Sequence, residues 1–395
     1  MLKNLLILAS LSSVALSQSW DDYNKEQTHI FQEHKKEFGI YQKSQDKEFE
    51  SYKQAQDSVF LNYKREAGAI WEKPKMSTKT TWVAYTPDKK TRTDVDFSKE
   101  TIVVETIAFS PKQAKLKLEV ALAKVVTIDN GTLQRTDPLQ NALSKVKKPF
   151  GLVDSKVENE PILSTVIFNR EPTKKTVDNY VKSHIEDSKI EVVESNKEQY
   201  AKVYSVKIQM PKDAMIKRSK LYYDEVKKQA SKRKLPISLV FAVMHSESSF
   251  NPRARSHVPA YGLMQIVPRT AGIDTYKFLY KKKKLVSSSY LYNSTNNITM
   301  GTAYLHILYY RYLRNIKDPT SRLYCTIAAY NTGAGNIAWA FVGKHNMSEA
   351  APLINKLSSK EVYNKLLKDL RFQEPKHYLK KVSSRMNAYH RVYGN

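Results

Sequence analysis

Residues 236–250 read PISLVFAVMHSESSF, a largely apolar run that ends in serines around a single glutamate. Val240, Phe241 and Met244 recur at helical spacing and define one apolar face. Glu247 follows Met244 by three residues and Val240 by seven, so a helix would project its carboxyl from the same face. Burial there would raise the pKa of the carboxyl, as a general acid needs. On this pattern alone, a glutamate in an ion pair near a helix end is the commoner outcome.

Amphipathic helical patterns continue from this run to the C-terminus. Strand signals disappear after Pro211, and the later breaks fall at prolines and glycines such as Pro252 and Gly333. This pattern predicts an all-α domain over residues 212–395.

A different pattern occupies residues 77–211. Short runs rich in β-branched and aromatic residues alternate with charged, helix-like stretches around 111–125 and 173–184. The runs with strand character are TTWVAYT (80–86), TIVVETIAF (101–109), PILSTVIF (161–168), KIEVVES (189–195) and KVYSVKIQM (202–210). We therefore predict an α+β domain. Its sequence has no glycine-rich phosphate loop and no His or Cys cluster at metal-ligand spacing, so we expect the chemistry elsewhere.

Aromatic residues in the segment 18–76 recur with a period of eleven. They are Phe38 with Tyr41, Phe49 with Tyr52, Phe60 with Tyr63, and Trp71. Eleven residues make three helical turns, so one long helix would carry all these rings on a single stripe and end near Gly68 or Pro74. We expect the stripe to pack on the rest of the protein. The alternative is a face that associates with a second copy of the chain or binds other proteins, such as cell-wall or envelope proteins.

The first residues predict export. Lys3 supplies a positive start, residues 5–16 form an apolar run too short to span a bilayer, and small residues follow at cleavage spacing. We interpret residues 1–17 as a cleavable signal peptide and expect a periplasmic protein. Residues 17–19 are Ser-Gln-Ser where a lipoprotein signal needs a cysteine, so we expect no lipid anchor.

Charge limits the binding partners that we expect, and the cysteine count limits the disulfides and metal sites. The chain has 65 Lys and Arg against 39 Asp and Glu, and its net charge of +26 predicts attraction to nucleic acid, an anionic membrane or a negatively charged wall polymer. Because the chain carries an export signal, we expect no nucleic-acid partner. The single cysteine, Cys325, excludes an intrachain disulfide and a thiol-based metal site.

Five motifs follow one another in the helical half. They are HSESSFNPRARS (245–256), YGLMQIVPRTAG (261–272), NITMGTAYL (297–305), AAYNTGAG (328–335) and EPKHYLKKV (374–382). In this order and spacing they resemble the lytic transglycosylases, whose catalytic domain is all-α and similar to goose lysozyme. The nearest likeness is to a membrane-bound branch with an α+β N-terminal domain, which YTPDKKTRTDVDF (85–97) also resembles.

The resemblance implies roles for individual residues of the first two motifs. Glu247 matches the catalytic acid of the family. Ser256 matches a serine that lines the substrate cleft near the scissile sugar. Gly262 and Gln265 match a turn and a glutamine that contact the sugar. Alternatively, Ser256 is an ordinary turn residue and Gln265 a surface amide.

The last two motifs supply the other expected substrate-binding residues. Tyr330 and Asn331 match cleft residues beside the acid. Glu374 and Tyr378 match residues that bind substrate and orient the catalytic group. Tyr330 could instead be a core aromatic, and Glu374 a charge favoured by a helix N-terminus. The motif departs from the family's usual Glu-Thr-Arg-x-Tyr at its second and third positions.

The resemblance also implies a mechanism with one carboxyl group. Most glycosidases need two carboxylates, but no Asp or Glu lies between Glu247 and Asp274 in the sequence. Glu247 would protonate the oxygen of the MurNAc-β-1,4-GlcNAc bond of peptidoglycan and then accept the proton of the muramic 6-hydroxyl. The product would carry a 1,6-anhydromuramic end, and no metal or cofactor would be needed. A hydrolytic lysozyme-like muramidase and an inactive wall-binding protein are the alternatives.

Overall fold

The computed structural model describes residues 47–168, 170–186 and 190–394. They form two compact units, one of residues 47–55 with 147–150 and a large one of the other described residues. The predicted signal peptide and residues 18–46 of the predicted helix lie outside the described residues. Within the described ranges, no helix has the length and apolar character needed to cross a membrane.

The predicted N-terminal helix runs over residues 47–70. In the small unit, the Phe150 backbone N–H donates to the Glu48 carboxylate over 3.1 Å. In the large unit, the rings of Tyr63 and Trp71 are buried and lie 6.0 and 6.4 Å from the ring of Tyr85. This part of the aromatic stripe packs on the protein, as predicted. Phe38 and Tyr41, at the start of the stripe, lie outside the described residues.

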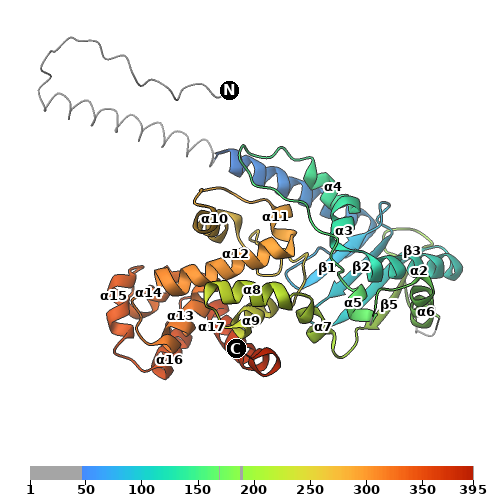
Figure 1. The fold of residues 1–395 in the computed structure, drawn as a ribbon. Coiled ribbons are helices and arrows are strands. Elements are labelled where there is room, and N and C mark those ends of the chain that lie inside the picture. The colour runs from blue at the N-terminus through green and yellow to red at the C-terminus, as the bar shows by residue number, and fades with distance from the viewer. Residues whose placement is uncertain (1–46, 169, 187–189, 395) are drawn as a thin grey trace, which may run out of the picture. The chain divides into compact units, whose positions relative to one another are not determined.

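One antiparallel sheet organises the α+β part. Its strand order is β1-β2-β3-β5-β4. Figure 1 shows the sheet. The strands are β1 (Thr81–Tyr85), β2 (Thr91–Asp96), β3 (Thr101–Ala108), β4 (Glu191–Glu194) and β5 (Lys202–Gln209). Val104 of β3 lies opposite Val206 of β5, and both are fully buried because alternate strand residues face the core.

Helices α2 (Pro111–Thr127) and α6 (Lys174–Ile185) cover this sheet. Ser110 caps α2 by accepting from the Gln113 backbone N–H, and Pro111 suits the first turn because it needs no donor there. Leu118 of α2 and Val181 of α6 share the buried core with the strands. The short helices α3 (Asn130–Thr136) and α4 (Pro138–Ser144) follow α2.

The strand prediction for PILSTVIF (161–168) is wrong. Ser164–Ile167 forms the short helix α5 instead. Leu163 and Val166 are fully buried in the core beneath the sheet. Spacing cannot separate a short buried strand from a buried helical turn, since both bury consecutive apolar residues.

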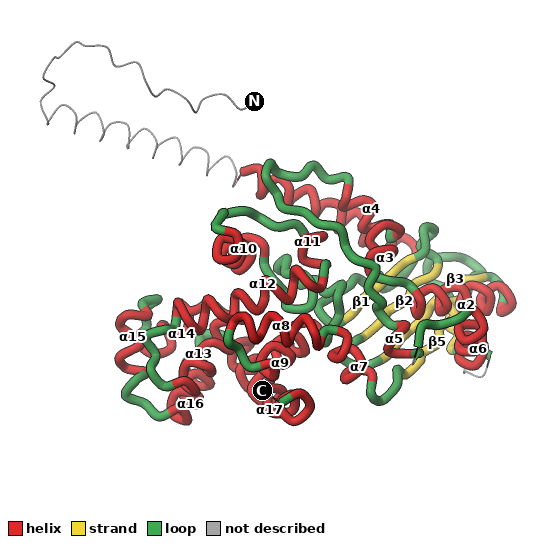
Figure 2. Tube along the Cα trace, in the orientation of Figure 1, coloured by secondary structure: helices red, strands yellow, loops and turns green. Residues whose placement is uncertain are grey.

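The described residues after Pro211 form helices and no strand of the sheet, as predicted (Figure 2). They are α7 (Ala214–Leu221), α8 (Tyr223–Arg233), α9 (Ile237–Ser248), the π-helical turn η1 (Pro268–Gly272), α10 (Ile273–Tyr280), α11 (Ser288–Tyr292), α12 (Ser294–Ile307), the π-helical turn η2 (Leu308–Tyr312), α13 (Pro319–Thr332), α14 (Ala334–Val342), α15 (Met347–Ile354), α16 (Ser359–Asp369) and α17 (Gln373–Tyr393).

Helix α9 lies in the core of this part because apolar side chains cover almost its whole circumference. Helix α17 packs along it, and the ring of Phe241 stacks at 4.5 Å on Tyr393 and at 5.5 Å on Tyr389.

Buried arginines join the helical part to the α+β part within the large unit. Arg218 of α7 is 1% exposed and donates to the Phe97 carbonyl over 2.9 Å. Arg253, in the loop after α9, donates to Gln134 of α3 over 2.8 Å and lies over the ring of Tyr292. Buried cations are stable only when they are paired, so these contacts hold the two parts together.

Candidate active site

Glu247 lies in the last turn of α9 and is only 5% exposed. Burial raises the pKa of its carboxyl to about 7, the largest effect on this group. The positive charges of Lys79 and Lys381 and the hydroxyl of Tyr378 oppose this rise, whereas the negative charge of Glu374 adds to it. Near neutral pH, Glu247 therefore exists in both its protonated and its ionised form.

The chain turns sharply directly after Glu247. Ser248 donates its hydroxyl to the Leu263 carbonyl over 2.8 Å. Ser249 and Phe250 take left-handed backbone conformations, with φ of 52° and 62°. Phe250 is buried, so packing of its ring stabilises a conformation that non-glycine residues rarely adopt. This turn ends α9 and holds the carboxyl at the helix end.

His245 is not a second acid in this motif. Burial lowers its pKa to about 3, and the nearby charges of Arg385 and Lys381 act in the same direction. Its Nδ1 lies 3.1 Å from the Tyr389 hydroxyl. The imidazole is therefore neutral at physiological pH and belongs to the packing between α9 and α17.

Two tyrosines lie beside Glu247. Tyr378 of α17 is buried, and its hydroxyl faces the carboxyl without reaching standard hydrogen-bond geometry, which leaves Oη without a partner in the described chain. Tyr330 of α13 donates to the Met264 carbonyl over 2.8 Å. Burial, followed by the charge of Glu247, raises the pKa of both phenols well above the usual value.

Three polar side chains, those of Asn331, Glu374 and Lys79, form the exposed rim of the site at Glu247. The sequence motifs did not indicate Lys79. Asn331 donates to Glu374 Oε1 over 3.4 Å, and Lys79 Nζ lies 3.5 Å from the same oxygen. Lys79 precedes β1 in the α+β part. Only the tertiary structure brings it here, because no motif around it signals a contact with Glu247.

Gly262 and Gln265 shape the second motif. Gly262 has φ of +74°, and a side chain there would collide with the Leu291 backbone and the Asn297 amide. Gln265 is 7% exposed and donates to the Gly262 and Ala254 carbonyls over 3.0 and 3.2 Å. The alternative of a surface amide is therefore wrong, because Gln265 is buried in the turn. Its Oε1 is buried and lacks a hydrogen-bond partner among the described residues.

The hydroxyl of Ser256 makes hydrogen bonds within its own loop. It donates to the Val258 carbonyl and accepts from the Ala260 backbone N–H over 3.1 Å. These contacts are those of a turn residue, and none of them joins Ser256 to Glu247. In the structure, Tyr330, Tyr378 and Glu374 therefore lie near Glu247. Asn331 is hydrogen-bonded to Glu374, and Ser256 lies in the adjoining loop.

Two family models match the chain. The model described as the N-terminal domain of membrane-bound lytic murein transglycosylase C matches residues 43–221, and the transglycosylase SLT domain model matches residues 224–351. A membrane-bound lytic murein transglycosylase C of Serratia proteamaculans (strain 568) is 32% identical over 311 residues, 78% of this chain and 82% of the relative. This chain belongs to that family. It is a lytic murein transglycosylase, an enzyme that acts on peptidoglycan.

A second relative of the same name, from Yersinia pestis (strain Pestoides F), is 34% identical over 311 residues, 78% of this chain and 82% of the relative. The matches confirm the family expected from the five motifs. They also confirm the likeness of residues 85–97 to the family's N-terminal domain, since these residues fall within the first matched region.

Solved lytic transglycosylases overlap part of the chain. The 70-kDa soluble enzyme of Escherichia coli is 28% identical and covers 46% of this chain and 26% of its own, with a TM-score of 0.35. An inactive mutant of the enzyme Slt from Pseudomonas aeruginosa is 24% identical and covers 45% of this chain and 27% of its own, with a TM-score of 0.34. Overlaps with TM-scores this low do not bear on the fold.

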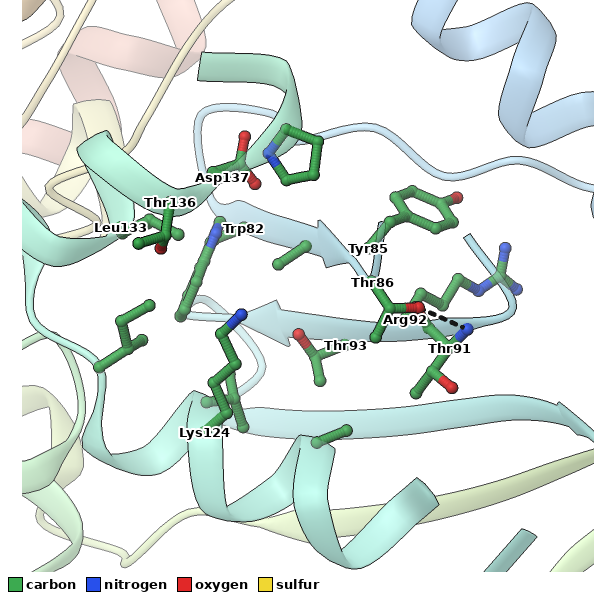
Figure 3. A pocket seen from close by; sticks show the side chains of 15 residues that line it. Trp82, Tyr85, Thr86, Thr91, Arg92, Thr93, Lys124, Leu133, Thr136 and Asp137 are labelled. Atoms are coloured by element: carbon green, nitrogen blue, oxygen red, sulfur yellow. Dashed lines mark hydrogen bonds between the residues drawn. The ribbon is translucent and has the colours of Figure 1, made fainter. Parts of the chain in front are cut away.

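The transglycosylase also has a pocket in its α+β part, away from Glu247. It is lined by Trp82 of β1, Lys124 of α2, Leu133 of α3 and Asp137 directly after α3 (Figure 3). None of the residues matched to the family's site contributes to it. Burial raises the pKa of Asp137, and its carboxylate caps α4 by accepting from the Gln140 backbone N–H.

Proposed function

We propose that this lytic transglycosylase uses Glu247 as both acid and base to cleave the MurNAc-β-1,4-GlcNAc bond in cell-wall remodelling and turnover. One observation carries the assignment: Glu247 is a buried carboxyl with a pKa of about 7 beside two tyrosines. A group with its pKa near the working pH can both give and take a proton, which makes it an efficient general acid and base.

In the first step, protonated Glu247 donates its proton to the glycosidic oxygen. The bond from that oxygen to C1 of the muramic sugar breaks, and the leaving chain keeps the proton on its new hydroxyl. In the second step, the muramic 6-hydroxyl attacks C1 while the Glu247 carboxylate takes the hydroxyl proton. The product carries a 1,6-anhydro ring, Glu247 is protonated again, and no water is consumed.

Two buried polar atoms, one of them beside Glu247, support a sugar site. Tyr378 Oη and Gln265 Oε1 lack hydrogen-bond partners in the described chain, although buried polar groups are normally paired. We propose that sugar hydroxyl or amide groups bind there. Asn331 and Glu374 would then contact the substrate at the exposed rim, and Gly262 and Ser256 would shape the adjoining loops.

The surroundings of Glu374 favour attack by the substrate's own hydroxyl over attack by water. Among the described residues, Glu374 is a carboxylate whose charge acts on Glu247, but its side chain is 70% exposed and is shared between Lys79 and Asn331. A second carboxylate that activates water must be held over the opposite face of the sugar. Glu374 is instead held at the rim, which supports a mechanism with one carboxyl group.

We also propose an envelope location. The relatives are named membrane-bound, and residues 1–17 have the pattern of an export signal, so we place this enzyme in the periplasm. We further propose that residues 77–211 and 212–395 act as the N-terminal and catalytic domains, and that the first part of the helix in 18–76 can bind other envelope proteins.

The decisive experiment compares the wild-type enzyme with Glu247→Gln on purified murein sacculi. We expect the wild type to release muropeptides with 1,6-anhydromuramic ends, identified by mass, and the variant to release almost none. Reducing ends from the wild type would establish the hydrolytic alternative. Release by Glu247→Gln at the wild-type rate would rule out Glu247 as the acid.

A further inference from the structure

We propose that Lys79, a residue of the α+β part, is a positioning residue of the active site in the helical part. Its ammonium group holds Glu374 at the rim and sets the electrostatic surroundings in which Glu247 exchanges its proton. This inference rests on the proposed role of Glu247. It means that the α+β part completes the catalytic site and does more than support it.

Hydrogen bonds hold the Lys79 backbone against the loop after α9. Thr78 and Thr81 form a tight turn around it, in which the Thr78 N–H donates to the Thr81 carbonyl over 3.0 Å. The buried side-chain amide of Asn251 donates to the Lys79 carbonyl over 3.3 Å and to the Thr81 carbonyl over 3.4 Å. The Arg255 N–H donates to the Thr78 carbonyl over 3.3 Å. The turn is thus attached to the chain that directly follows Glu247.

The side chain of Lys79 extends from this turn to the rim. Its Nζ lies 3.5 Å from Glu374 Oε1, and the side chain is 41% exposed. Among the charges that favour ionised Glu247, Lys79 has the largest effect and Lys381 a smaller one. Burial is the main cause of the lowered pKa of Lys381, and Lys79 lowers it further, so both ammonium groups act at the same site.

Lys79 belongs to a different part of the chain from the other groups around Glu247. The charged and titratable groups that act on Glu247 or respond to its charge are Lys79 before β1, Tyr330 on α13, and Glu374, Tyr378 and Lys381 on α17. Lys79 is the one member of this set outside the helical part. An opposite charge stabilises the ionised form of a carboxyl. Lys79 therefore keeps Glu247 acidic enough to release its proton in spite of its burial.

The test replaces Lys79 by Met in the full-length enzyme. Lys99→Met is the matched control, because Lys99 lies in the same α+β part, is 78% exposed and forms an ion pair with the nearby Asp96. The first readout is the ¹³C resonance of the Glu247 carboxyl, assigned by its loss in Glu247→Gln and followed against pH. The second is the pH profile of sacculus digestion.

We expect the Glu247 titration and the alkaline limb of the profile to move to higher pH by about half a pH unit or more in Lys79→Met. Lys79→Arg, which keeps the charge, should restore the wild-type midpoint, and Lys99→Met should not move it. A midpoint in Lys79→Met equal to the wild-type value would overturn the inference. Because the carboxyl titration needs no turnover, it decides this question even if the proposed reaction is wrong.

A second variant changes Glu374, the other member of the same ion pair. Glu374→Gln removes a negative charge near Glu247, so we expect its carboxyl to titrate at lower pH than in the wild type. Should Lys79→Met fail to give the wild-type circular dichroism spectrum, Lys79→Gln and Glu374→Gln take its place. Shifts of opposite sign in the Lys79 and Glu374 variants support the inference, and the absence of any shift overturns it.

Discussion

The carboxyl of Glu247 and the hydroxyl of Tyr378 face each other between α9 and α17, both buried, and the phenol has no hydrogen-bond partner of standard geometry among the described residues. The hydroxyl lowers the pKa of the carboxyl, while burial and the carboxylate charge raise the pKa of the phenol. The phenol therefore stays protonated and can donate to Glu247 or to a bound sugar.

Tyr378→Phe tests this relationship. Loss of the hydroxyl removes a group that favours ionised Glu247, so the alkaline limb of the pH profile should move to higher pH and kcat should fall by about 10–100-fold. Stability should change by no more than about 1 kcal/mol, because the hydroxyl has no protein partner to lose. The measurements are sacculus digestion against pH and thermal unfolding. Tyr363→Phe, on α16, is the control, and an alkaline limb at lower pH would contradict the prediction.

Glu247→Gln should change how stability depends on pH. The pKa of Glu247 is about 7 in the folded protein and near the ordinary value of 4.5 in the unfolded chain, so the folded state binds the extra proton. This extra proton makes a favourable contribution to the free energy of unfolding. The contribution is complete below pH 4.5 and is lost as pH rises through 7. Glutamine cannot ionise, so the variant should gain stability over the wild type in that window, by roughly 3 kcal/mol at most.

Urea unfolding at pH 4.5 and pH 8 checks this sign, with Glu171→Gln on the exposed surface as control. A Glu247→Gln advantage that is larger at pH 4.5 than at pH 8 would refute the assigned protonation.

Gly262→Ala should destabilise the enzyme strongly. Its φ of +74° disfavours any side chain, and a methyl group would also collide with the Leu291 backbone and the Asn297 amide. We expect a loss of about 2–4 kcal/mol in the free energy of unfolding. Gly343→Ala is the control, since Gly343 has φ of +66° but open space around it and should lose only about 1 kcal/mol. Equal losses in the two variants would show that the collision plays no part.

Arg253→Met should weaken the contact between the α+β and helical parts. The Asn130 and Gln134 amides would lose their cationic donor, and leaving a buried polar group without its partner costs about 1–3 kcal/mol. Calorimetry should show an unfolding transition that is lower in temperature and broader, or split in two. Arg391→Met, on the exposed face of α17, should unfold as the wild type does. A single transition at the wild-type temperature in Arg253→Met would count against the anchoring role.

Sequence patterns predicted the elements whose signals are local. The structure confirms these local predictions: residues 236–250 and 111–125 carry the helices α9 and α2, and residues 101–109 and 202–210 carry the strands β3 and β5. The error at residues 161–168 has the opposite cause. A short apolar run meets the requirements of a strand and of a buried turn equally well, and only the surrounding core favours α5.

For the candidate active site, the sequence by itself determined the family and predicted the helix that carries Glu247 and the motif residues Tyr330, Asn331, Glu374 and Tyr378. The tertiary structure decided which of these act on the acid. It buried Gln265 in a turn and kept Ser256 within its own loop.

The tertiary structure also brought Lys79 to the rim. The pKa of Glu247 depends on its burial and on the charges that act on it, and the chain supplies those charges from segments far apart in sequence. A motif can name the acid, but the fold sets the pH range in which that acid can work.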